Sequence, residues 1–175
     1  AQAQVDSLKA DGCDYIIGLG HLGIDKESIG NRSTDLLNVV DGIDVFIDGH
    51  SHSTMKDIAE VTEKDGKVNG TLLTSTGTKL AYVGVLIIDN KTKLPEGLEM
   101  LDLGQYEYED AKVTAAAKAI MEPIDAEYSA VFAKSEVELN GDKEPGNRTQ
   151  ETNLGNLITD AMMWAIKTKA PGVDM

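Results

Sequence analysis

Val45-Phe46-Ile47-Asp48-Gly49-His50-Ser51-His52 is the stretch of sequence that decides the fold. Its first part, residues 45–48, predicts a buried parallel strand, because β-branched and aromatic residues bounded by a turn former favour that state. Ligands of open α/β sheets bind beyond the carboxyl ends of the strands, and Gly49 lets the backbone turn sharply at that point. We therefore expect His50 and His52 to be two candidate metal ligands on one loop.

A second apolar run has the same form. Residues 14–19 predict another short strand, which is followed by Gly20-His21-Leu22-Gly23. If the two strands are parallel neighbours, His21 reaches the same edge of the sheet as the other two histidines of the chain. Imidazole nitrogens suit zinc, manganese, iron or nickel rather than calcium. The pattern therefore predicts a divalent-metal site, in which Asp48 caps or orients a loop histidine and does not itself bind metal.

The segments around these runs predict a mixed sheet. Ser33 or Thr34 is expected to cap a helix between the two strands, which gives a right-handed β-loop-α-β unit. The expected apolar face of this helix consists of Leu36, Leu37, Val39 and Val40. Residues 58–62, 68–74 and 82–89 are β-rich and predict antiparallel strands and hairpins. Because these antiparallel strands follow a parallel pair, the expected class is α/β with a mixed sheet. Residues 91–109 predict a surface connection.

The second part of the chain predicts two helices. One covers residues 111 to about 130, with a bend near Pro123. A turn cluster follows at residues 140–146, and Thr152 or Asn153 is expected to cap the next helix. The apolar face of that helix is expected to contain Leu154, Leu157, Ile158, Ala161 and Ala165, with Met162, Met163 and Trp164 packed in a core.

Composition limits the classes of partner. The formal net charge is −14, from 16 basic and 30 acidic residues, which argues against nucleic acids and anionic membranes as main partners. No apolar run approaches the ~20 residues that span a bilayer, so we expect no membrane span. Cys13 is the single cysteine and cannot form an internal disulfide. The opening residues, Ala1 to Val5, lack a basic region followed by an apolar core, so we expect no signal peptide here.

The two histidine loops, with Gly42-Ile43-Asp44-Val45 between them, resemble the second half of the two-metal phosphoesterase domain of 5′-nucleotidases and 2′,3′-cyclic-nucleotide phosphodiesterases. Residues 147–161 resemble the opening motif of the nucleotidase C-terminal substrate domain. The resemblance implies the C-terminal part of a metallophosphoesterase α/β/β/α sandwich in residues 1–109, a linker helix in residues 110–133, and the start of an α+β substrate-binding domain in residues 134–175. We therefore expect the chain to be an internal fragment of a longer protein.

The resemblance also implies roles for four residues. His21 and His50 match two ligands of one metal, and His52 occupies the position that gives a ligand to the other metal. Arg148 matches an arginine that grips substrate phosphate. The family supplies its bridging carboxylate and its catalytic histidine from the N-terminal half, so we expect no catalytic residue in this chain and place those residues upstream of Ala1. The parent would hold two divalent ions, such as zinc or manganese, and this chain one or none.

The implied function of the parent is hydrolysis of nucleoside phosphate esters by a metal-activated water, as in 5′-nucleotidases. Two alternatives stay open. One is a 2′,3′-cyclic-nucleotide phosphodiesterase or another enzyme of the same architecture, such as a thiosulfate-transferring relative. The other is a non-enzymatic metal-binding or structural module. The substrate would be a nucleotide or another small phosphate ester, and we expect this chain alone to have little or no phosphatase activity.

Two further expectations concern the setting of the protein. The resemblance implies an extracytoplasmic location, in the periplasm or the cell wall, because relatives are commonly exported. Half of a sheet would leave an exposed strand edge and an open apolar face. Unpaired edges favour pairing with another chain, so we expect self-association between copies.

Overall fold

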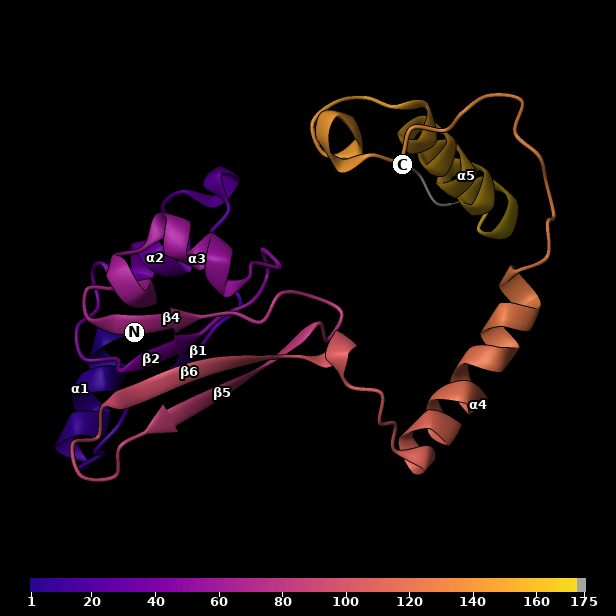
Figure 1. Cartoon of the computed structure of the whole chain (residues 1–175). Coiled ribbons are helices and arrows are strands. Elements are labelled where there is room, and N and C mark those ends of the chain that lie inside the picture. The colour runs from indigo at the N-terminus through magenta and orange to yellow at the C-terminus, as the bar shows by residue number, and fades with distance from the viewer. Residues whose placement is uncertain (173–175) are drawn as a thin grey trace. The chain divides into compact units, whose positions relative to one another are not determined.

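The structure, a computed structural model, describes residues 1–172 (Figure 1). The chain forms two units, one from Ala1 to Tyr108 and one from Glu109 onward. Each unit is described by itself below. The expected boundary between the first domain and the linker helix, after residue 109, is close to this division, and the identity of the expected domains stays a prediction.

A four-stranded mixed sheet organises the first unit. Its strands are β1 (Ile17–Leu19), β2 (Val45–Ile47), β3 (Lys67–Val68) and β4 (Thr71–Thr74), in the order β1-β2-β4-β3. The strands β1, β2 and β4 are parallel, and β3 runs antiparallel to β4. The predicted mixed sheet is confirmed, as is the parallel pairing of the two strands that precede the histidine loops.

Helices cover one face of this sheet. They are α1 (Gln2–Ala10), α2 (Ser33–Leu37) and α3 (Met55–Val61), and Figure 1 shows α2 and α3 together on one side of the strands. The register pairs Gly18 with Phe46 and Phe46 with Leu73, so these residues share the covered face. The core on this side consists of Val5, Ile16, Leu37, Val40, Ile43, Phe46, Ile58, Val68 and Leu73.

A separate hairpin completes the first unit. It consists of β5 (Tyr82–Ile88) and β6 (Pro95–Asp102), which pair antiparallel. Leu98 and Met100 of β6 line one cavity together with Leu72, whose side chain lies on the sheet face opposite to Phe46. The helices, the mixed sheet and the hairpin therefore form three successive layers.

The prediction of a surface connection over residues 91–109 is wrong for β6. This segment pairs with β5 along nearly its whole length, from Tyr82 opposite Asp102 to Ile88 opposite Pro95. Pro95 is the first residue of the strand, where a missing N–H group interrupts no ladder. The strand forms because it pairs with another part of the chain. The glycines and charged residues of this segment are typical of a loop, so its local sequence did not predict a strand.

The prediction of a strand over residues 58–62 is also wrong, because this stretch lies within α3 and the residue after it. The helix begins after Thr54, whose N–H and hydroxyl groups both donate to the Asp57 carboxylate, at 2.7 and 2.8 Å. A Thr followed three residues later by an acid is a signal for the start of a helix, and here it outweighs the β propensity of Ile58 and Val61.

The helix between β1 and β2 begins one or two residues earlier than predicted. Arg32 is its N-cap, so Ser33 and Thr34 lie inside the first turn and not at the cap. The helix ends at Leu37, so Val39 and Val40 of its expected apolar face lie beyond it. Val40 is buried as expected, but Val39 is 77% exposed and does not belong to the core.

Part of the first unit leaves apolar side chains exposed. The strand β1 lies at the edge of the sheet, and its residues Ile17 and Leu19 are 51% and 82% exposed. Both side chains lie on the face opposite to Phe46, which no helix of this unit covers. The expected self-association through such an edge stays a prediction.

The second unit contains the two predicted helices, α4 (Ala111–Tyr128) and α5 (Asn153–Lys169). Asp110 caps α4 by accepting the N–H groups of Lys112 and Val113, and Thr152 caps α5 by accepting that of Gly155. Pro123 lies inside α4, and a bend there stays a prediction.

The expected core around α5 is not formed. Met162, Met163 and Trp164 are exposed, the last by 66%, as are Leu157 and Ile158 of the expected apolar face. Among the described residues from Glu109 onward, only Gly146 and Thr152 are buried. The described residues contain no helix that is long and apolar enough to cross a membrane.

The remaining helical turns are short. Within the described part of the chain they are three 3₁₀ turns and one irregular turn, at Lys26–Ser28, Lys64–Gly66, Leu103–Gln105 and Lys143–Asn147. The last of them falls in the predicted turn cluster at residues 140–146.

The packing of β1 against β2 allows a direct test. An ideal Cβ atom at Gly20 would lie 2.4 Å from Cζ of Phe46, and one at Gly18 would lie 2.5 Å from its Cδ2. We expect Gly20→Ala to lower the free energy of unfolding by about 1–3 kcal/mol, because the rigid ring must move. Gly97→Ala is the control, because no atom lies within 4 Å of its Cβ position. Equal stability of the two variants in urea unfolding would contradict this packing argument.

Candidate metal centre

Two histidines meet where β1 and β2 end. The ladder continues one residue past the end of β1, because the N–H of Gly20 donates to the carbonyl of Ile47, the last residue of β2, at 2.9 Å. Directly beyond this bond, the rings of His21 and His50 lie with their centroids 5.2 Å apart and their planes at 77°. Both histidines are exposed. The structure therefore brings two of the three predicted ligands together at the predicted edge of the sheet.

The loop of residues 48–52, here called the His50 loop, has an unusual backbone. His50 and His52 have φ values of 76° and 55°, a left-handed region that L-residues adopt at a cost of roughly 1–2 kcal/mol. Gly49 lies between Asp48 and His50, and a Cβ atom there would be 2.9 Å from Nδ1 of His21. The glycine therefore lets the His21 imidazole approach the backbone of the His50 loop.

Asp48 connects this loop to residues 20–23, here called the His21 loop. Its Oδ1 atom accepts the N–H of Leu22 at 2.9 Å, and its Oδ2 atom accepts the N–H of Gly23 at 3.0 Å. The two donors directly follow His21. The expectation that Asp48 caps or orients a loop histidine agrees with these contacts.

Serine side chains add further contacts to the His21 loop. Ser51 accepts the N–H of Ile24 at 3.2 Å, and its hydroxyl lies 2.7 Å from that of Ser53. On the other side, the N–H and hydroxyl groups of Ser33 both donate to the carbonyl of Gly23 at 3.0 Å. The sequence did not predict these contacts, and it indicated Ser33 only as a helix cap. The position of Ser51 between His50 and His52 was the one sequence signal that could have indicated its contact with the His21 loop.

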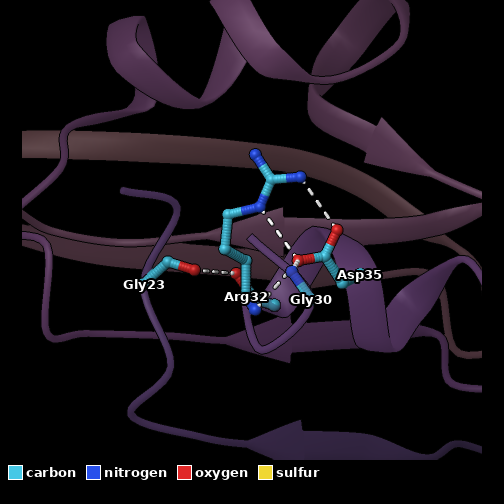
Figure 2. A network of polar contacts seen from close by, with 5 residues as sticks. Gly23, Gly30, Arg32 and Asp35 are labelled. Carbon is cyan, nitrogen blue, oxygen red and sulfur yellow. Dashed lines mark hydrogen bonds and ion pairs between the residues drawn. The ribbon is translucent and has the colours of Figure 1, made fainter. Parts of the chain in front are cut away.

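An ion pair fixes the start of α2 next to Ser33. Arg32 donates from Nε and Nη2 to the two oxygens of Asp35, at 2.9 and 2.8 Å (Figure 2). The backbone N–H groups of Gly30 and Arg32 also donate to this carboxylate. The hydrogen bonds from Arg32 hold the pKa of Asp35 well below its usual range. The carboxylate therefore stays ionised at neutral pH and keeps α2, and with it Ser33, in place.

His52 faces a different environment. It lines an open cavity of about 480 Å³ between the His50 loop, the 3₁₀ turn at Lys26–Ser28 and α3. Four carboxylates and two cationic side chains also line this cavity: Asp25, Glu27, Asp57, Glu60, Lys26 and Arg32. Within residues 1–172, no group of three or more His, Cys, Asp or Glu side chains is arranged to hold a metal ion. The metal-ligand roles of His21, His50 and His52 therefore stay predictions.

Arg148 lies in the second unit, just before the cap of α5. Its side chain is exposed, and its N–H donates to the carbonyl of Lys143 at 3.3 Å. Asn153, the first residue of α5, accepts the N–H of Asn140 and donates to the carbonyl of Glu138. These bonds join the start of α5 to the preceding segment. A phosphate-binding role for Arg148 stays a prediction.

The chain is similar to several known proteins, although no protein-family model matches it. The chain is 31% identical over 106 residues to the trifunctional nucleotide phosphoesterase protein YfkN of Bacillus subtilis, covering 55% of this chain and 7% of that protein. It is 30% identical over 174 residues to the endonuclease YhcR of the same organism, covering 93% and 13%. It is 28% identical over 176 aligned positions to the 5′-nucleotidase of Rattus norvegicus, covering 93% and 29%. The chain thus spans less than a third of the length of these relatives.

Solved structures share the fold. The sulfate thiohydrolase SoxB of Thermus thermophilus aligns with 98% of this chain and 28% of its own, at a TM-score of 0.57 and 21% identity. The calcineurin-like phosphoesterase YfkN of Bacillus subtilis aligns with 73% of this chain and 43% of its own, at a TM-score of 0.53 and 23% identity. The predicted α/β class, with part of a metallophosphoesterase fold, is confirmed.

Proposed function

The chain belongs to the 5′-nucleotidase/metallophosphoesterase family, and on that premise we propose that the protein carrying it is a metal-dependent phosphohydrolase that acts on nucleotides. The observation that carries this proposal is the placement of His21 and His50, with ring centroids 5.2 Å apart beyond two parallel strands. Ligands of α/β sheets bind at this edge. The names of the relatives, a nucleotide phosphoesterase and a 5′-nucleotidase, support the choice of substrate class.

The local geometry fits a divalent ion of the zinc or manganese class. His21 and His50 are exposed, their rings are adjacent, and the absence of a side chain at Gly49 lets the His21 ring approach the His50 loop. Two imidazoles provide only part of a coordination sphere, so the remaining ligands would come from other parts of a longer protein. Such ions polarise a phosphoryl oxygen and activate water for attack. The role of this chain would be to hold two imidazoles in a fixed relation.

His52 and Arg148 have distinct parts in the proposal. His52 would give a ligand to a second ion, next to the cavity that it lines. Arg148 would contact the substrate phosphate. Its guanidinium makes no ion pair within the part of the chain that the structure describes, and a planar guanidinium suits bidentate contact with phosphate oxygens.

Other activities of this fold are weaker candidates. A 2′,3′-cyclic-nucleotide phosphodiesterase would use the same histidines and differ in substrate contacts. SoxB is named a sulfate thiohydrolase, and its likeness to this chain concerns the fold alone. YhcR is named an endonuclease, but a net charge of −14 disfavours a long nucleic-acid substrate here. The non-enzymatic alternative is a module that binds metal without turnover. We also propose an extracytoplasmic location, in line with the family resemblance.

A substrate panel on the whole protein tests the proposed function. Nucleoside 5′-monophosphates, 2′,3′-cyclic nucleotides, a thiosulfonate ester and single-stranded DNA are each supplied with Mn²⁺ or Zn²⁺. We expect phosphate release from the monophosphates, and loss of this activity when EDTA removes the metal. Turnover that survives EDTA would contradict metal dependence. Turnover of cyclic nucleotides alone would favour the phosphodiesterase, and metal binding without turnover would favour the structural module.

A further inference from the structure

We propose that Asp48 is a positioning residue, which holds the His21 loop in the one arrangement that lets His21 and His50 share a metal ion. The inference rests on the proposed function for the metal, and on the contacts of Asp48 for the positioning. The residue lies directly after β2, and it contacts backbone groups 25 and 26 positions away in the sequence.

Both oxygens of the Asp48 carboxylate accept hydrogen bonds. Each of them accepts one backbone N–H, from Leu22 at 2.9 Å and from Gly23 at 3.0 Å. Hydrogen bonds to an ionised group are roughly twice as strong as neutral ones. Because the donors are the two residues after His21, the carboxylate fixes the direction in which the chain leaves that histidine. Because both oxygens are directed at the backbone of the His21 loop, we assign Asp48 a role through this loop and not as a ligand.

Gly23 is held in place by contacts on several sides. Its φ value is +75°, and a Cβ atom there would lie 3.0 Å from the backbone nitrogen of Ser51. Its carbonyl accepts two hydrogen bonds from the fully buried Ser33. The His21 loop therefore lies between α2 and the His50 loop, and the Asp48 carboxylate is the ionised group that joins the two histidine loops.

A second aspartate makes a comparable contact within the same pair of strands. Asp44, just before β2, accepts the N–H of Ile16 through Oδ2 at 2.7 Å. The contact has the same chemistry as that of Asp48, and it joins the same two segments at their opposite end. Asp44 touches neither histidine loop. It is therefore a matched control, which separates general anchoring of β1 to β2 from positioning of the histidines.

The test compares Asp48→Asn with Asp44→Asn in the full chain, titrated with Mn²⁺ alone by isothermal titration calorimetry. An asparagine side chain offers one acceptor oxygen and places an NH₂ group against the second backbone donor. We expect Asp48→Asn to weaken Mn²⁺ binding by about 10- to 100-fold, as other supporting contacts of metal ligands do. We expect Asp44→Asn to stay within about twofold of the unaltered chain, because its contact is remote from the histidines.

Two readouts do not depend on metal. Hydrogen exchange of the Leu22 and Gly23 amides should accelerate in Asp48→Asn and stay unchanged in Asp44→Asn. In NMR spectra, the nuclear Overhauser contact between the His21 and His50 rings should weaken only in Asp48→Asn. If Asp48→Asn fails to fold, Asp48→Glu keeps the charge and both acceptors, and is expected to fold and to bind Mn²⁺ more weakly.

The outcomes separate this inference from the proposed function. Equal losses of affinity in Asp48→Asn and Asp44→Asn would overturn it, because Asp48 would then only anchor the strand. Unaltered affinity in a folded Asp48 variant would overturn it as well. An unaltered chain that binds no Mn²⁺ would agree with ligands supplied by other parts of a longer protein, and the ring contact and the amide exchange would then decide on Asp48: if both survive Asp48→Asn, the positioning role is wrong.

Discussion

His50→Ala is expected to abolish measurable binding of Mn²⁺ or Zn²⁺, and His21→Ala is expected to do the same. The two rings are adjacent, with centroids 5.2 Å apart, so a metal ion between them depends on both. Removal of either ring leaves a single imidazole at this edge of the sheet. Because each histidine is exposed, its loss creates no cavity, and both variants are expected to keep the thermal stability of the unaltered chain.

His52→Ala is the matched control for this prediction. It removes the same side chain from the same loop, but His52 lines the cavity beside α3. Calorimetric titration should show that this variant keeps the ion held by the other two histidines, while binding at any second site is weakened. Complete loss of binding in His52→Ala, or full binding in His50→Ala, would show that the metal lies elsewhere.

Local sequence patterns predicted the elements that position the site. The apolar runs before His21 and His50 form the parallel strands β1 and β2, because β-branched residues bounded by glycine leave few alternatives. The meeting of His21 and His50 then follows from strand direction, since the carboxyl ends of adjacent parallel strands share an edge. The caps at Asp110 and Thr152 are equally local, and the helices that follow them were predicted.

The remaining features depend on contacts between distant parts of the chain. The strand β6 exists because it pairs with β5, and its own composition resembles that of a loop. Asp48 reaches the amides after His21 through the three-dimensional arrangement of the two loops, so its partners have no signature in the sequence. Trp164 has the apolar character of a core residue, yet it is exposed, because the described part of its unit offers little to pack against.

Phe46→Ala is expected to lower the free energy of unfolding by about 3–5 kcal/mol, the usual cost of removing a buried aromatic ring. Phe46 is 4% exposed, belongs to the core beneath α2 and α3, and lies against the backbone of Gly18 and Gly20. Ile47→Ala is the control. Ile47 is the next residue of β2, it points to the opposite face, and it is 39% exposed, so its truncation should cost about 1 kcal/mol or less.

Urea unfolding of Phe46→Ala and Ile47→Ala measures the difference in their free energies of unfolding. The double variant that combines Phe46→Ala with Gly20→Ala tests whether the ring acts through its contact with Gly20. If the ring is what excludes a side chain at Gly20, then Gly20→Ala should cost much less when Phe46 is already alanine. The two changes would then be strongly non-additive, as expected for residues in direct contact. Additive costs would mean that Phe46 stabilises the core without setting the path of β1. Non-additive costs would show that one ring controls how closely β1, which precedes the His21 loop, approaches β2, which precedes the His50 loop.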